Sequence, residues 1–289
     1  MSGERSAKRT VRRAFSRAAP DYDRHAVLQR EVGTRLLEHL DPIRIAPSRL
    51  VDLGCGTGAA FADLRKRYPD ARLVGIDLAL PMLDAARARN PWWRRALQGN
   101  AAQLACADAE RLPLASGCAG LLFSNLMLQW CDPSAVFAEA ARVLETGGLL
   151  LFSTYGPDTL MELRAAFAEE GARHVHSFVD MHDLGDALVA AGFADPVMEM
   201  EKVTVEYASV EALAKDLRAA GEGNALPARP RGLGGRERWR RMVERYEGRR
   251  RGDALPATYE IVYGHAWKAA PRRVADGRAI VDFHPRRAP

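Results

Sequence analysis

Between residues 49 and 154, short apolar runs alternate with longer amphipathic segments, and this alternation limits the folds open to the chain more than any other feature. The runs have the length of buried strands and occupy residues 49–53, 72–77, 103–107, 120–124 and 149–154. The segments with helical length and period occupy residues 59–68, 81–89 and 134–144. Strands and helices that alternate at this spacing predict an α/β fold with a doubly wound parallel sheet and helices on both faces.

The flanking segments extend this core at both ends. Residues 14–40 have helical periodicity, and residues 198–207 and 257–268 have the pattern of a sixth and a seventh strand. We therefore predict one domain over residues 14–270. Its parts are an N-terminal helical lid at 14–47 and an arginine-rich helical insertion at 209–252. Residues 1–13 are predicted to form a disordered basic tail and residues 271–289 a loose C-terminal tail.

Composition narrows the class of protein. The 289 residues suffice for one large domain, and no apolar run approaches the ~20 residues of a membrane span. The basic N-terminus is not followed by the apolar segment of a secretory signal. The four cysteines form no C-x-x-C pair and have no metal-ligand spacing. These features predict a cytoplasmic protein with reduced thiols, no membrane association and no metal site.

The positive charge is concentrated in one segment. The formal net charge is +5, yet residues 218–252 hold eleven arginines and four glutamates, a local net charge of +7. A basic block of this kind can bind nucleic acid, a membrane surface or an acidic protein. It can equally be a solvated helix face, so the charge alone does not decide between these readings.

A glycine-rich turn follows the first apolar run. The stretch VDLGCGTGAAF, residues 51–61, places Gly54, Gly56 and Gly58 directly after a predicted strand and before a predicted helix. An acid, Asp77, ends the next strand 19 residues after Gly58. In such folds that acid accepts hydrogen bonds from ribose hydroxyls, so the turn predicts a nucleotide or nucleoside ligand.

Two further acids help to distinguish between the candidate ligands, S-adenosylmethionine and NAD. The dinucleotide fingerprint is G-x-G-x-x-G, whereas this turn reads G-x-G-x-G with Asp52 two residues ahead of it. An acid at that position suits a cationic amino group better than a diphosphate. A second acid, Asp108, follows the third strand, where it can reach an adenine amino group. These details favour S-adenosylmethionine, with NAD and a ligand-free structural loop as alternatives.

Together the three motifs resemble the class I S-adenosylmethionine-dependent methyltransferases over residues 48–155. The resemblance implies a Rossmann-like sheet of seven strands with the last antiparallel, and S-adenosylmethionine as cofactor. It implies that Asp52 holds the amino group of the methionine part, close to the glycine backbone. The other implied cofactor contacts are Asp77 to the ribose, Asp108 and the Ala109 amide to the adenine, Leu78 and Met82 packing beside it, and Asn125 facing the methyl group.

The regions outside the cofactor motifs bear on the methyl acceptor. Residues 124–130, SNLMLQW, lack the proline pair of nucleic-acid amino methyltransferases and the Pro-Cys of cytosine C5 enzymes, so we expect no nucleic-acid substrate. The stretches SNLMLQWCDP, FSTYGPDTLMELRAAF, HVHSFVDMHDLGDALVAAGFADPVMEME and ATYEIVYGHAWK resemble the malonyl-acyl-carrier-protein O-methyltransferase family. This similarity spans residues 14–268. It implies methylation of the free carboxyl of a malonyl thioester at the start of pimelate assembly for biotin.

The implied reaction needs alignment more than base catalysis. A carboxyl group is already ionised at pH 7, so the site must bind the anion, exclude water and point one oxygen at the methyl carbon. Neutral hydrogen-bond donors suit this task, because a tight ion pair would weaken the nucleophile. The candidates are Tyr22, Gln129 and Trp130, followed by Tyr155, His176 and His182.

The resemblance also offers a partner for the basic segment. Acyl carrier proteins are acidic, and a basic face near the pocket would steer one toward it. The candidate docking residues are Arg236, Arg238, Arg240, Arg241 and Arg245. Whether the malonyl group arrives on the carrier protein or on coenzyme A stays open at this point. Two other functions also remain: an assembly-factor-like protein of the arginine hydroxylase type, and a methyltransferase for a small acid or quinone precursor.

Overall fold

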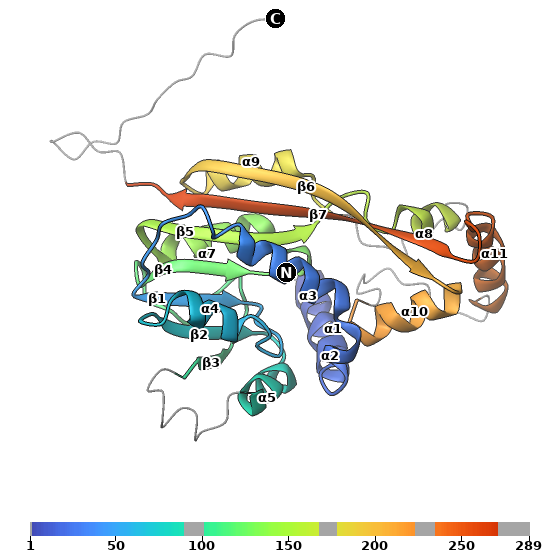
Figure 1. Ribbon diagram of the computed structural model, residues 1–289, viewed down its shortest axis with the longest axis horizontal. Coiled ribbons are helices and arrows are strands. Elements are labelled where there is room, and N and C mark those ends of the chain that lie inside the picture. Colours follow the sequence, from blue (N-terminus) through green and yellow to red (C-terminus); the bar gives the residue numbers. More distant parts are fainter. Residues whose placement is uncertain (1, 90–100, 168–177, 223–234, 271–289) are drawn as a thin grey trace, which may run out of the picture.

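The computed structural model describes residues 2–89, 101–167, 178–222 and 235–270. Its centre is a seven-stranded sheet in the order β3-β2-β1-β4-β5-β7-β6 (Figure 1). Neighbours among β1 to β5 pair in parallel, and β7 runs antiparallel to both β5 and β6. This confirms the predicted doubly wound sheet with an antiparallel last strand. The strands are β1 (Arg49–Leu53), β2 (Arg72–Asp77), β3 (Gln103–Cys106), β4 (Ala119–Ser124), β5 (Leu144–Tyr155), β6 (Phe193–Tyr207) and β7 (Leu255–Lys268).

The sheet is covered on both faces, which explains why its central strands are largely apolar. Every residue of β4 is buried, as expected for a strand between two helical layers. Leu36 and Leu64 belong to the core on one face, while Phe137 and Leu184 belong to the core on the other. The first face carries α3 (Val27–Glu38), α4 (Phe61–Arg67) and α5 (Leu80–Arg89), and the second carries α7 (Pro133–Val143) and α9 (Met181–Ala190).

The N-terminal segment differs from the sequence prediction. Residues 1–13 were expected to be a disordered tail, but residues 2–18 form one helix, α1 (Ser2–Ala18), followed by the short α2 (Tyr22–His25). Ala18 and Ala19 pack against Ala79 and Met82, at the start of α5. The helix has few apolar residues of its own, so these tertiary contacts, rather than its amphipathic pattern, stabilise it.

The last two strands are long and carry a second group of helices at one end. Figure 1 shows α8 (Met161–Ala166), α10 (Val210–Ala219) and α11 (Gly235–Glu247) around that end. Tyr246 of α11 is fully buried, and its hydroxyl donates to the Pro256 carbonyl oxygen at 2.9 Å. Residues 209–252 thus contain α10 and α11, with residues 223–234 outside the described part. The tail at 271–289 also lies outside it, and no helix in the described ranges is long and apolar enough to cross a membrane.

Candidate active site

A cavity opens at the carboxyl ends of β1, β2 and β4, where the sheet order reverses. It encloses roughly 670 Å³ of empty space, part of it open to solvent. This is the position at which ligands bind in open α/β sheets. Predicted residues that line it are Tyr22, Gly54, Gly56, Asp77, Leu78, Met82, Asp108, Ala109, Asn125 and Trp130.

The three glycines of the turn have different reasons to be glycine. Each has a positive φ, which is costly for other residues. A Cβ on Gly54 would come within 2.4 Å of the Met127 side chain, and one on Gly58 within 2.7 Å of the Phe61 ring. A Cβ on Gly56 would meet nothing within 4 Å. Gly54 and Gly56 line the cavity, whereas Gly58 allows α4 to pack against the turn.

Asp77 ties the glycine turn to the end of β2. Its Oδ2 accepts from the Gly56 amide at 3.0 Å, and its Oδ1 accepts from the Ala79 amide at 2.8 Å. Burial raises the pKa of Asp77, and these amide hydrogen bonds oppose the rise. The carboxylate therefore lies at the cavity wall in the position predicted for a ribose contact.

Asp52 lies deeper than the sequence suggests. It is 3% exposed and does not belong to the cavity lining. Burial, and secondarily the charge of Asp77, raises the pKa of Asp52 to about 8. A cation in the cavity would favour the ionised forms of both acids, so the pair is suited to a positively charged ligand.

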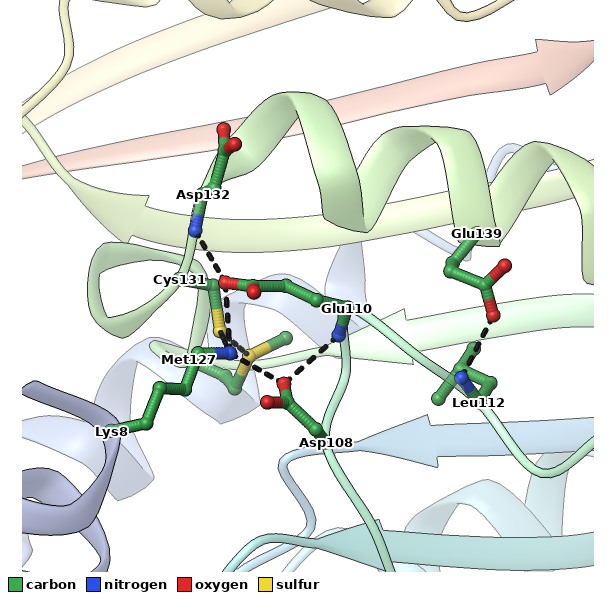
Figure 2. A network of polar contacts seen from close by, with 8 residues as sticks. All are labelled: Lys8, Asp108, Glu110, Leu112, Met127, Cys131, Asp132 and Glu139. Atoms are coloured by element: carbon green, nitrogen blue, oxygen red, sulfur yellow. Dashed lines mark hydrogen bonds and ion pairs between the residues drawn. The ribbon is translucent and has the colours of Figure 1, made fainter. Parts of the chain in front are cut away.

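Asp108, the acid after β3, has a partner that could not be identified from the sequence pattern. Figure 2 shows Lys8 of α1 between Asp108 and Glu110, with its Nζ 2.5 Å and 2.8 Å from their carboxylate oxygens. Asp108 Oδ1 also accepts from the Glu110 amide at 3.0 Å, and Glu110 accepts from the Asp132 amide at 2.8 Å. Lys8 therefore joins α1 to the loop after β3 and, through Glu110, to the start of α7.

One face of α1 lines the cavity. Lys8, Val11 and Phe15 follow one another at helical spacing, and all three belong to the lining. The Phe15 ring makes edge contacts with Tyr22 and Trp130, at centroid distances of 6.4 and 5.5 Å. The helical spacing of these three residues could have indicated a helix with one face toward the site. That helix was not predicted from the sequence, because basic residues dominate the segment.

Asn125 uses its side chain to hold neighbouring elements. Its Nδ2 donates to the Gln29 carbonyl oxygen on α3 at 2.8 Å, and its Oδ1 accepts from the Ser153 hydroxyl at 2.8 Å. A Cβ on Gly33 would lie 3.0 Å from the Asn125 amide nitrogen, so α3 sits close against this side chain. Asn125 thus fixes α3 at the end of β4 while also lining the cavity.

The structure separates the predicted acceptor-site residues into two groups. Tyr22 and Trp130 line the cavity, and burial, then the charge of Glu222, raises the pKa of Tyr22, so its hydroxyl stays protonated at neutral pH. Gln129 does not line it. Its amide donates to the Leu126 carbonyl oxygen at 2.7 Å and accepts from Thr154 at 3.3 Å, which stabilises the loop after β4.

Tyr155 and His182 do not line this cavity. Tyr155 is 2% exposed, and its hydroxyl donates to Glu222 Oε1 at 2.6 Å. His182 is exposed at the start of α9 and contacts Asp180. His176 lies outside the described residues. Within the described ranges, no group of three or more histidine, cysteine or acidic side chains is arranged to hold a metal ion.

Known proteins resemble this chain along nearly its whole length. A family model described as a methyltransferase domain matches residues 51–152. The malonyl-acyl-carrier-protein O-methyltransferase of Laribacter hongkongensis is 53% identical over 96% of both chains, and that of Gallionella capsiferriformans is 50% identical over 95% of both. The chain belongs to this O-methyltransferase family.

The family relatives cover the helices outside the sheet as well as the sheet itself. Solved structures resemble the fold alone. A putative methyltransferase from Bacillus halodurans has a TM-score of 0.56 at 16% identity, covering 82% of this chain and 99% of the other. The chain therefore has a sheet of the methyltransferase type, and the acids and helices around its cavity can be tested directly.

Because Asp52 has a raised pKa, we predict that S-adenosylmethionine binding releases a proton. The cationic amino group should lower the pKa of Asp52 in the complex, so binding should tighten as pH rises from 6 to 8, by up to about tenfold per unit. Isothermal titration calorimetry in buffers of different ionisation enthalpy should give about one proton released at pH 7. Asp52→Asn should abolish the proton release. Asp63→Asn, which changes an exposed acid of α4, is the control and should leave the proton release unchanged. Tight binding by the wild type without proton release would contradict the prediction.

A second prediction concerns Lys8. Lys8→Met keeps the aliphatic stem but leaves Asp108 and Glu110 without their cation, so the dissociation constant for S-adenosylmethionine should rise about tenfold. Lys8→Arg should reduce the affinity for S-adenosylmethionine less than Lys8→Met, because the positive charge is kept. Arg12→Met, at an exposed position on the same helix, is the matched control and should bind normally. Equal affinities for Lys8→Met and Arg12→Met would show that Lys8 does not hold the lid.

Proposed function

We propose that this chain transfers the methyl group of S-adenosylmethionine to the free carboxylate of a malonyl thioester, giving the methyl ester that starts pimeloyl and biotin synthesis. The observation that carries this conclusion is identity of about one half with malonyl-acyl-carrier-protein O-methyltransferases over 95–96% of the chain. That similarity includes the lid and the helices beyond the sheet, which surround the acceptor. It therefore favours this function over the assembly-factor and small-acid alternatives.

The reaction needs no proton transfer. One carboxylate oxygen attacks the methyl carbon in line with the sulfur, the carbon–sulfur bond breaks, and its electron pair stays on sulfur. The products are the neutral methyl ester and S-adenosylhomocysteine. The enzyme contributes alignment and exclusion of water, which agrees with a lid-covered cavity.

The cofactor contacts predicted from the sequence fit the cavity with one change. Asp77 takes the ribose hydroxyls, and Leu78, Met82 and the Ala109 amide surround the adenine. Asp108 reads the adenine amino group while Lys8 remains bound to it. Asp52 acts from behind the turn through its charge, together with the backbone of Gly54 and Gly56, instead of touching the ligand.

The acceptor end of the cavity has neutral side chains. Tyr22 holds the substrate carboxylate through its protonated hydroxyl, and Trp130 and Phe15 exclude water beside it. Asn125 fixes the floor under the methyl group. Gln129 remains a prediction that its contacts do not support, because both ends of its amide are engaged in the loop.

The relatives named for malonyl-acyl carrier protein make an acidic carrier the expected partner, and we propose that arginines of α11 dock it. Arg240 is 65% exposed and pairs with Glu237 and Glu244 of its own helix. Arg241 pairs with Glu237, and Arg245 donates to the Ala166 carbonyl oxygen of α8. Arg240 is therefore the most accessible of these three, Arg238 is a further candidate, and the side chain of Arg236 lies outside the described part.

The function is tested by mass spectrometry of malonyl-acyl carrier protein after incubation with the enzyme and S-adenosylmethionine. We expect a mass gain of about 14 Da, one methyl group replacing a proton, that an esterase removes. Malonyl-coenzyme A is assayed in parallel to decide which thioester is preferred. No mass gain on either thioester, with cofactor binding shown by calorimetry, would overturn the proposal.

The docking role of α11 is tested by charge reversal. Arg240→Glu should raise KM for the carrier substrate by about fivefold at low salt, with a smaller difference at high salt, because the interaction is electrostatic. Arg87→Glu is the matched control, since Arg87 on α5 is 52% exposed and also pairs within its helix. The affinity for S-adenosylmethionine should be unchanged in both. Equal KM values for the two variants would exclude Arg240 from docking.

A further inference from the structure

A second cavity lies beside the first, between the lid and the last two strands. It contains roughly 620 Å³ of empty space, part of it open to solvent, and is bounded by α3, α10, β6 and β7. Much of its wall is apolar, and the apolar residues are Leu28, Val203, Val205, Leu217, Ala220 and Tyr259. Val27, which also belongs to the lining, is 60% exposed. The cavity can therefore admit a slender, largely uncharged chain from solvent.

Gln29 connects the two cavities. Its side chain lines the second cavity, while its carbonyl oxygen accepts from Asn125, which lines the first. Its Nε2 donates to Glu222 at 2.7 Å, and Glu222 also lines the second cavity. The charge of Glu222 acts on Tyr22 in the cofactor cavity. Gln29 and Glu222 therefore belong to the wall between the two cavities.

Gln29 also has an unsatisfied acceptor. Its Oε1 is buried and has no hydrogen-bond partner among the described residues. The orientation of the amide is set by Glu222, because the carboxylate accepts from Nε2. A buried acceptor without a partner costs free energy, and a ligand with an amide N–H would remove that cost. Pantetheine is such a ligand: it has two amide groups on a flexible chain with an apolar gem-dimethyl centre.

We propose that this second cavity holds the acyl-pantetheine arm of the substrate and that Glu222 binds the malonyl carboxyl at the wall between the two cavities. The inference rests on the proposed function and adds the route by which the acceptor reaches the methyl group. The arm lies along the apolar wall, one amide donates to Gln29 Oε1, and the malonyl end reaches Tyr22 past Glu222.

Glu222 can do this only in its neutral form. Burial, together with the charge of Asp216, raises the pKa of Glu222, while Tyr155 and Gln29 donate to its Oε1 and oppose the rise. The groups with an electrostatic effect on Glu222 are acids or phenols: Tyr22 on α2, Tyr155 on β5, Tyr207 on β6, Asp216 on α10 and Tyr259 on β7. His25 of α2, which contacts Asp216, and Glu31 of α3 line the same cavity. A protonated carboxyl donates to one oxygen of the substrate carboxylate and leaves the other free to attack.

The first experiment fills the cavity. Val205→Trp on β6 projects a large ring into the space, and Val197→Trp makes the same change at a position of that strand that is 43% exposed and not part of the lining. We expect Val205→Trp to raise KM at least tenfold for both malonyl-acyl carrier protein and protein-free malonyl-pantetheine. The affinity of both variants for S-adenosylmethionine should stay within twofold of the wild type, which also reports correct folding. A normal KM for Val205→Trp would overturn the proposal.

A measurement on the unmodified enzyme keeps the test independent of folding. Malonyl-pantetheine should slow amide hydrogen exchange in residues 203–207 and 213–220, which border the cavity, and leave residues 193–198 unchanged. No protection at saturating ligand would overturn the proposal. Absence of methyl transfer by the wild type would reject the proposed function itself, whereas an active wild type with a normal Val205→Trp variant rejects only the cavity.

The second experiment separates the neutral from the ionised form of Glu222. Glu222→Gln resembles the protonated acid at every pH, so its kcat/KM should stay constant from pH 6.5 to pH 9. The wild type should lose activity as pH rises through the pKa of Glu222, by about tenfold per unit above it. Titration of the substrate affects both enzymes equally. The same alkaline decline in Glu222→Gln, or activity as low as that of Glu222→Leu at every pH, would contradict this role.

Discussion

The hydrogen bond from the Gly56 amide to Asp77 sets the position of the whole site, because it joins the glycine turn after β1 to the end of β2. Two more amides of the turn, those of Gly54 and Cys55, donate to the Ile76 carbonyl oxygen at 2.8 and 3.0 Å. The positive φ angles of the glycines make this path possible. The fixed turn holds Asp52 and Asp77 beside the cavity. Their carboxyl groups favour a cationic ligand there.

The second part of the site is the lid, here taken as helices α1 to α3, of which α1 and α2 form part of the cavity wall. α1 contacts the loop after β3 through Lys8, and α3 contacts the end of β4 through the hydrogen bond from Asn125 to the Gln29 carbonyl oxygen (Figure 2 shows the first of these). Both contacts cross from the lid to loops at the carboxyl edge of the sheet. These polar contacts add to apolar packing, because Leu36 of α3 belongs to the core of the sheet and Ala18 of α1 packs against Met82 of α5.

The parts of the fold that depend on local sequence patterns could be predicted from the sequence. The order of strands and helices, the glycine turn and the acids Asp77 and Asp108 all lie where spacing predicted them. Contacts between distant segments were not predictable in this way. Residues 1–13 were expected to be disordered because their basic residues obscure the helical spacing of Lys8 and Val11, and because the packing of α1 beside α5 is a contact between distant segments.

A local feature of the backbone separates the side chains that were predicted for the acceptor site. Gln129 and Trp130 are adjacent in sequence and both follow β4, yet only Trp130 lines the cavity. The short 3-10 turn at Leu128–Trp130 points the two side chains in different directions, and Gln129 satisfies its amide within the loop. Sequence position brought both to the right end of the strand, and the local backbone decided which of them faces the ligand.

The chemistry explains why such a site combines buried acids, neutral donors and a closing lid. A carboxylate and a sulfonium react to give two neutral groups, so charge disappears along the reaction path. An apolar, dry environment stabilises the separated reactant charges less than water does, and it therefore favours the transition state in which they cancel. The negative potential of Asp52 and Asp77 beside the cavity is unchanged by the reaction, but the sulfur loses its positive charge in the product. The same electrostatic preference that draws in S-adenosylmethionine therefore holds S-adenosylhomocysteine less strongly, and turnover gains from the charge that the reaction removes.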